Sequence, residues 1–201
     1  MMKYLVALIV LVSSLNHSYA IDLEQFFKKS YEFEYNGNYQ KAIETLKNVY
    51  DKDSYEMNLR LGWLYYMSSL FQESSDYYQK CISAKSYSIE AKFGLINAQS
   101  AMGYWDAVVK QYGEILKIDA NNSKANYQLG YIYYNRKDFR NALKYFEKVV
   151  NLYPFDHDAL LMNAWTQLQL SKFNDAKLMF EKVLMNTPGD ESAKEGLSYI
   201  K

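Results

Sequence analysis

The chain is 201 residues long, and its 23 basic and 23 acidic side chains leave a formal net charge of zero. This balance argues against nucleic acid as a partner and against electrostatic attachment to anionic membranes, because both require an excess of basic residues. The lone cysteine, Cys81, excludes an internal disulfide, so packing must stabilise the fold.

The first twenty residues predict a secretory signal peptide. Lys3 precedes an apolar run from Tyr4 to Val12, and a small-x-small end stands at residues 18–20. The run is well short of the ~20 residues that a membrane span needs, and no later segment is apolar enough to span a bilayer. We therefore expect cleavage after Ala20 and export to the periplasm or the outside of the cell. Residues 21–201, which contain no linker-like stretch, would then form a single domain.

Residues 123–156 carry the pattern of one helix-turn-helix unit. Apolar and small residues recur at steps of three and four in two stretches, with a polar break at residues 135–138, and Pro154 ends the second stretch. The residues that define the two helices are Tyr127, Leu129, Gly130, Tyr133, Phe139, Ala142, Phe146, Val149 and Val150. Their types and offsets closely resemble the tetratricopeptide repeat (TPR) motif, apart from Asn126, where the motif has a large aromatic residue.

The same 34-residue frame fits the rest of the chain. Adjoining repeats occupy residues 55–88, 89–122, 123–156 and 157–190, a shorter copy occupies about 23–54, and a short capping helix is expected over residues 191–201. The repeat over 89–122 departs most, with Ile96 and Val108 where the motif has small residues. The resemblance implies an all-α fold, an α-solenoid of tandem TPR units that forms a right-handed superhelix with a C-terminal capping helix.

In the family that the chain resembles, the exposed face of the first helix of each repeat lines a concave groove. Read at five places in each of the five repeats, this face has ten aromatic residues among twenty-five, against 17% for the whole chain. An exposed aromatic patch of that extent marks a binding surface, and Tyr and Trp are suitable anchors for a partner. The predicted groove residues are Phe27, Tyr31, Tyr35, Trp63, Tyr66, Phe93, Tyr127, Tyr131, Tyr134 and Trp165.

The charged residues on this face are mostly acidic. They are Glu24, Glu34, Glu56, Glu90 and Asp158, against Lys124 alone. This excess favours a partner with some basic character. Family members that hold a chaperone's C-terminal carboxylate need Lys and Asn where this chain has Phe27 and Tyr31, so that carboxylate clamp is absent.

Three hypotheses follow for the aromatic face. The leading one is a non-enzymatic interaction module, a TPR scaffold of the cell envelope that binds a peptide or helix of a partner protein in the groove. The alternative is binding of a saccharide or cell-wall glycan, which requires solvent-facing rings beside carboxamides, as at Tyr131/Asn135 or Trp165/Gln169. The third is self-association through the groove. Against all three, the rings could simply pack between neighbouring first helices.

The remaining polar residues favour neither catalysis nor cofactors. Cys81 falls in a column of apolar residues, so we expect a buried packing thiol, and His157 is expected on a surface turn. After signal cleavage one His and one Cys remain, too few for a zinc site, so we expect no metal and no cofactor. Acidic pairs such as Asp156/Asp158 stand where repeats join and are interpreted as helix caps.

Overall fold

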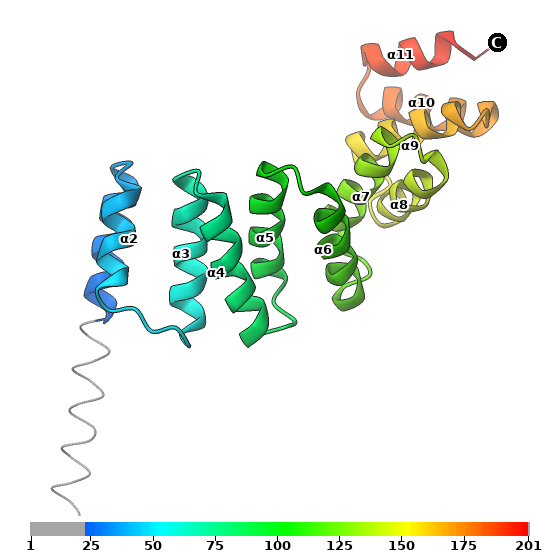
Figure 1. Cartoon of the computed structure of the whole chain (residues 1–201). Coiled ribbons are helices and arrows are strands. Elements are labelled where there is room, and N and C mark those ends of the chain that lie inside the picture. The colour runs from blue at the N-terminus through cyan, green and yellow to red at the C-terminus, as the bar shows by residue number, and fades with distance from the viewer. Residues whose placement is uncertain (1–22, 201) are drawn as a thin grey trace, which may run out of the picture. The chain divides into compact units, whose positions relative to one another are not determined.

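The computed structural model describes residues 23–200, and all regular structure in that range is helical (Figure 1). The predicted signal peptide, residues 1–20, lies outside the described part of the chain. The first helical segment covers residues 23–35. The helices that follow are α2 (Tyr39–Lys47), α3 (Tyr55–Met67), α4 (Phe71–Ala84), α5 (Ile89–Ala101), α6 (Trp105–Ile118), α7 (Ser123–Asn135), α8 (Phe139–Leu152), α9 (His157–Gln169), α10 (Phe173–Asn186) and α11 (Glu191–Ser198).

The all-α prediction is therefore confirmed, whereas the right-handed superhelix stays a prediction. No helix within residues 23–200 combines the length and the apolar character that a bilayer span requires.

Four of the repeats and the capping helix begin with the same kind of helix cap. The helices α3, α5, α7, α9 and α11 start at 34-residue intervals, and the residue before each start accepts a hydrogen bond from the backbone N–H three positions later. The capping residues are Ser54, Ser88, Asn122, Asp156 and Asp190. Ser, Asn and Asp stabilise helix starts by satisfying a backbone donor that has no intrahelical partner. The interpretation of Asp156 as a cap is confirmed.

Two buried asparagines explain why the chain departs from the TPR motif at Asn126. The Asn126 side-chain amide donates to the carbonyl oxygens of Ala120 and Asn122, at 3.2 and 2.9 Å. Asn58, at the equivalent place two repeats earlier, donates in the same way to the carbonyl oxygens of Lys52 and Ser54, at 2.8 Å each. An amide at this place therefore holds the turn that enters the repeat, where the motif uses an aromatic ring for packing.

Aromatic rings of second helices pack onto glycines of first helices. A Cβ placed on Gly94 would lie 2.2 Å from the ring of Tyr78, and one placed on Gly196 would lie 2.1 Å from Phe180. Both distances are shorter than any real carbon contact, so only glycine permits these close approaches. Phe146 fills the space beside Gly130 in the same manner.

The chain divides into two compact units, each with its own core. The N-terminal unit ends at Tyr104 and the C-terminal unit starts at Trp105, so the division falls between the two helices of the degenerate repeat over 89–122. Leu46, Leu61 and Leu64 are fully buried in the N-terminal unit, and Phe180 and Val183 in the C-terminal unit. A single domain over residues 21–201 stays a prediction.

Candidate functional site

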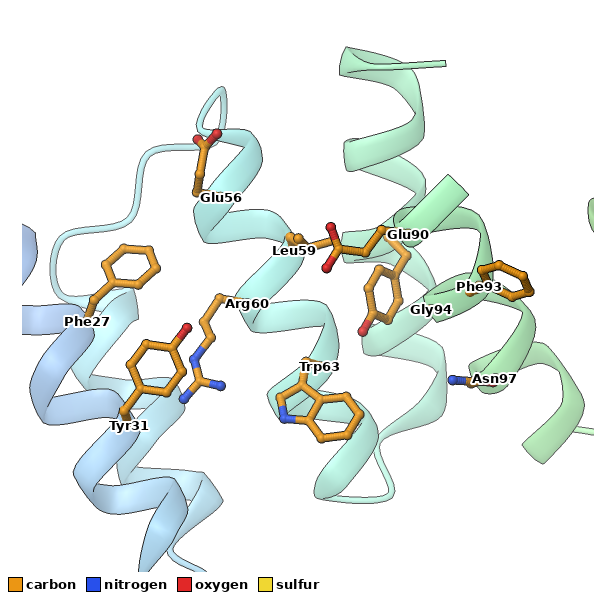
Figure 2. Close-up of a pocket in the computed structure, with 11 residues that line it drawn as sticks. Phe27, Tyr31, Glu56, Leu59, Arg60, Trp63, Glu90, Phe93, Gly94 and Asn97 are labelled. Atoms are coloured by element: carbon orange, nitrogen blue, oxygen red, sulfur yellow. The ribbon is translucent and has the colours of Figure 1, made fainter. Parts of the chain in front are cut away.

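An open cavity of about 530 Å³ lies on the N-terminal unit (Figure 2). The helix over residues 23–35, α3 and α5 contribute most of its lining, and α4 adds one residue. The lining residues are Phe27, Tyr31, Glu56, Leu59, Arg60, Trp63, Tyr78, Glu90, Phe93, Gly94 and Asn97. Four of the ten predicted groove residues, Phe27, Tyr31, Trp63 and Phe93, are brought together here.

Helix periodicity explains why these side chains meet. Each of the three first helices contributes a pair four residues apart, and residues with that spacing lie one turn apart on one face. The pairs are Phe27/Tyr31, Leu59/Trp63 and Phe93/Asn97. Successive first helices therefore present their equivalent faces to the same cavity.

The aromatic rings of the cavity are accessible to a ligand. Tyr31 is 54% exposed and Trp63 is 38% exposed, while Phe27 and Phe93 are half-buried. Large rings with this much open surface could gain considerable apolar burial from a bound partner.

A buried arginine holds the two exposed rings in place. The Arg60 guanidinium lies over the Tyr31 ring, 3.8 Å from its centroid, and pairs with the Glu34 carboxylate. The Trp63 Nε1–H donates to the same carboxylate. Burial raises the pKa of Glu34, but the hydrogen bonds from Arg60 and Trp63 outweigh it and leave the pKa below its usual value. Glu34 therefore stays ionised and links Tyr31, Arg60 and Trp63 into one cluster.

The sequence did not single out Arg60 or Tyr78 as site residues. Arg60 is only 8% exposed, whereas arginine side chains usually lie on the surface, so its burial could not be predicted from residue type. Tyr78 lies in the column that holds packing aromatics in the other repeats, and burial raises its pKa. The Tyr78 ring packs on Gly94, which directly follows Phe93. This glycine is the sequence signal that could have placed Tyr78 beside the groove face.

The other two predicted groove residues of the N-terminal unit lie outside this cavity. Tyr35 is 90% exposed and lines a second cavity, of about 830 Å³, on the helix over residues 23–35. Tyr66 is half-buried, stacked at 6.2 Å on Trp63 and tilted against Phe71 at 5.6 Å. Tyr66 therefore supports Trp63 rather than facing a ligand in the cavity.

In the C-terminal unit the predicted groove residues lie on α7 and α9. Tyr131 is exposed, but Tyr127 and Tyr134 are half-buried and pack edge-on against Phe146 and Phe139, at 5.7 and 5.3 Å between ring centroids. For these two rings the packing interpretation describes the contacts that the structure contains.

Trp165 is held by the capping helix. Its Nε1–H donates to Ser192 Oγ of α11 at 3.0 Å, and its ring packs against Phe180 at 5.2 Å and Tyr199 at 6.2 Å. It also contacts the apolar core of the C-terminal unit. The carboxamide of Asn135, which the saccharide hypothesis placed beside Tyr131, donates to the Tyr131 backbone oxygen instead.

The side chains of Cys81 and His157 both make structural contacts. Cys81 is fully buried, and burial raises its thiol pKa to about 12, so the prediction of a packing thiol is confirmed. His157 is not a free surface residue as expected, since it is half-buried at the start of α9 and bonded to Asp158 and Asp190, at 3.0 and 2.9 Å. No group of three potential metal ligands occurs among residues 23–200.

Comparison with known families and structures gives consistent matches to one kind of protein. Family models described as tetratricopeptide repeat match residues 27–89 and 123–156. A tetratricopeptide repeat protein from Parabacteroides merdae is 20% identical with a TM-score of 0.74, covering 89% of this chain and 72% of that one.

Two further solved structures resemble the chain. YrrB, described as a TPR protein with an unusual peptide-binding site, is 15% identical with a TM-score of 0.70, covering 92% of this chain and 97% of its own. MamA from Desulfovibrio magneticus RS-1 is 14% identical with a TM-score of 0.69, covering 85% and 97%. At these identities the likeness shows the fold alone. A comparison with curated protein sequences found no match.

Proposed function

This chain belongs to the tetratricopeptide repeat family, and from that premise we propose that it binds a peptide segment or helix of a partner protein in the aromatic cavity of its N-terminal unit. TPR folds serve as scaffolds for protein–protein interaction, and no step of this proposal requires an enzyme activity. The observation that carries it is the meeting of Phe27, Tyr31, Trp63 and Phe93 from three successive first helices at one open cavity.

The apolar area of the exposed aromatic rings supports a protein ligand. An aromatic side chain buries about 150–250 Å² when fully covered, and Tyr31 and Trp63 keep much of their surface open. Because Arg60 and Glu34 hold both rings, little side-chain freedom is lost when a partner binds. Rigid, partly exposed Tyr and Trp residues are typical of the anchors that dominate binding energy at interfaces.

The likeness to YrrB offers a precedent for the ligand class, since that protein is described as having a peptide-binding site. Similar folds often carry different functions, so the proposal depends on the cavity of this chain and takes only the kind of ligand from the precedent.

We further propose that the protein acts in the cell envelope after export. The basis is the signal-peptide pattern of residues 1–20. Fractionation of cells that express the chain with a C-terminal tag, followed by N-terminal sequencing, tests this proposal. We expect a chain that starts at Ile21 outside the cytoplasm. An uncleaved chain that stays in the cytoplasm would contradict export.

The test of partner binding compares three forms of the protein. The parent, a Tyr31→Ala/Trp63→Ala variant and a Tyr87→Ala control are used to capture proteins from envelope and soluble fractions of the source organism. Tyr87 is an exposed tyrosine of the same unit and is absent from the cavity lining, so its substitution controls for the loss of an exposed ring elsewhere on the surface. Circular dichroism verifies that all three remain helical.

We expect a protein that the parent and the Tyr87→Ala control recover and that the double variant loses. Its binding is then measured with purified components. Equal recovery by the double variant would contradict the proposed function and would direct the search to other surfaces.

A further inference from the structure

The cavity of the N-terminal unit contains two carboxylates that no basic residue of the cavity lining neutralises. Glu56 and Glu90, at equivalent places in α3 and α5, both line the cavity. Arg60 is the only basic residue in the lining, and its guanidinium pairs with Glu34. The charges of Arg60 and Glu34 therefore cancel, and the cavity as a whole is acidic.

Glu90 is the better placed of the two carboxylates. Its side chain is exposed and extends from α5 toward Leu59 of α3 (Figure 2). Among the described residues, 23–200, no side chain forms an ion pair or hydrogen bond with the Glu90 carboxylate. The partner of Glu56 is Lys85 at 3.6 Å, an exposed pair that contributes little. Glu90 thus offers a carboxylate that is ready to accept a cation.

The surroundings of Glu90 suit a long basic side chain rather than a free ion. Leu59 supplies apolar surface along which the methylene stem of Lys or Arg can lie. Trp63, which lines the same cavity, supplies a ring face, and a cation over such a face gains roughly a two- to fivefold increase in affinity at an exposed site. A carboxylate with aromatic neighbours is a combination that attracts a basic side chain.

From this arrangement we infer the chemistry of the occupant, a step that rests on the proposed function. The cavity binds a peptide segment that presents a Lys or Arg side chain to Glu90, with an apolar residue beside it on Trp63 and Leu59. Segments that present Asp or Glu at this place are excluded, because like charges would meet Glu56 and Glu90 in a partly desolvated site.

The test begins with selection of short random peptides displayed on phage against the immobilised full chain. The selected sequences are synthesised and titrated by fluorescence anisotropy against the parent and four variants. Trp63→Ala removes a ring, Glu90→Gln and Glu56→Gln/Glu90→Gln remove charge at constant size, and Glu73→Gln is the control. Glu73 is an exposed acid of α4 in the same unit and is absent from the cavity lining.

We expect the selected peptides to be enriched in Lys or Arg next to an apolar residue. Glu90→Gln should weaken their binding roughly three- to fivefold, and the double substitution roughly tenfold, as for partly exposed charge pairs. Glu73→Gln should leave the affinity unchanged. Replacing the basic residue of the peptide by Met should weaken binding to the parent at least as much as Glu90→Gln does, and should cost much less in Glu56→Gln/Glu90→Gln than in the parent, because both changes remove the same charge interaction.

Two outcomes overturn the inference, and only the second also contradicts the proposed function. Peptides that lose binding to Trp63→Ala but show no basic preference, or that bind Glu90→Gln as tightly as the parent, contradict the basic side chain and leave the proposed function intact. Peptides that bind Trp63→Ala as tightly as the parent contradict the proposed function itself.

Discussion

Trp63 in the N-terminal unit and Trp165 in the C-terminal unit occupy the same place in their repeats but make different contacts. The Trp63 indole donates to Glu34, which belongs to the preceding first helix, and its ring borders the open cavity. The Trp165 indole donates to Ser192 of the capping helix α11, and its ring packs on Phe180 and Tyr199. One ring borders an open cavity, and the other joins helices of the core.

The difference comes from the first helix of the next repeat, or the capping helix in its place, after each tryptophan. After Trp63 the next first helix is α5, which brings Phe93, Gly94 and Asn97 to the cavity and leaves it open. After Trp165 the place of the next first helix is taken by α11, and Ser192 of α11 and Tyr199 directly after it contact the indole. The same repeat position can therefore face an open cavity or pack in the core, depending on the residues that its neighbour presents.

The largest effect that we expect in this comparison is at Glu34. Glu34→Ala would leave the nearly buried guanidinium of Arg60 without its carboxylate and would release the Trp63 indole. Removing one partner of a buried charge pair destabilises strongly, and because Glu34 is partly exposed we expect a loss of about 2–3 kcal/mol. Urea denaturation measures the change. A loss below about 0.5 kcal/mol, typical of a surface site, would contradict the role given to the cluster.

The next effect concerns the glycines. Gly94→Ala forces a methyl group into the Tyr78 ring, and we expect destabilisation of about 1–3 kcal/mol from overpacking. Gly113→Ala in α6 of the C-terminal unit is the matched control, because no atom lies within 4 Å of the added carbon. There the better helix propensity of alanine should stabilise by about 0.5–1 kcal/mol.

The buried thiol provides a local readout of the same change. Cys81 lies in the Tyr78 cluster and has its pKa raised to about 12, so alkylation at neutral pH requires opening of the N-terminal unit. Gly94→Ala should accelerate alkylation, whereas Gly113→Ala should not. Equal rates in the parent and Gly94→Ala would show that the ring moves aside at no cost.

The smallest effect is a dependence on pH near neutrality, which we expect from the His157 contacts of the C-terminal unit. The His157 imidazole bonds to Asp158 and Asp190, which raises its pKa, and the backbone N–H of Ala193 together with His157 lowers the pKa of Asp190. The His157 contribution is complete below its unfolded pKa of about 6.5 and is lost as pH rises through the raised value. The Asp190 contribution is lost as pH falls through its lowered pKa.

The link should therefore stabilise most at mildly acidic pH, by less than about 1 kcal/mol because His157 is partly exposed. His157→Gln should reduce stability near pH 5.5, about one unit below the reference pKa, and have little effect near pH 8.5, about two units above it. In the N-terminal unit the equivalent link is a neutral one, Tyr55 to Ser88 at 2.6 Å. A Tyr55→Phe variant with the same pH profile as His157→Gln would contradict this assignment.

The sequence was sufficient for the fold because the TPR pattern is local. Residue types at fixed offsets, from Leu129 to Pro154, specify two helices and their turn, and the same spacing repeats along the chain. The face that meets the cavity followed from the resemblance to the TPR family, which placed Phe27, Tyr31, Trp63 and Phe93 on the groove side of their helices.

The parts that could not be predicted depend on contacts between repeats. Nothing in the offsets distinguishes Trp63 from Trp165, because their environments depend on the side chains of the following helix. The burial of Arg60 depends on Tyr31 and Glu34 in the preceding repeat. Likewise, the bridge from His157 to Asp190 spans one full repeat and appears only when both helix starts are placed.

The most direct test of the contrast between the two tryptophans is to measure peptide affinity and unfolding free energy together for Trp63→Ala and Trp165→Ala. We expect Trp63→Ala to weaken binding of a selected peptide tenfold or more, as roughly expected for an interface anchor, at a cost below about 1 kcal/mol in stability. Trp165→Ala should cost about 2–3 kcal/mol through lost packing and leave the affinity unchanged where the protein is folded. Equal losses of affinity in both variants, or equal losses of stability, would contradict the division of roles.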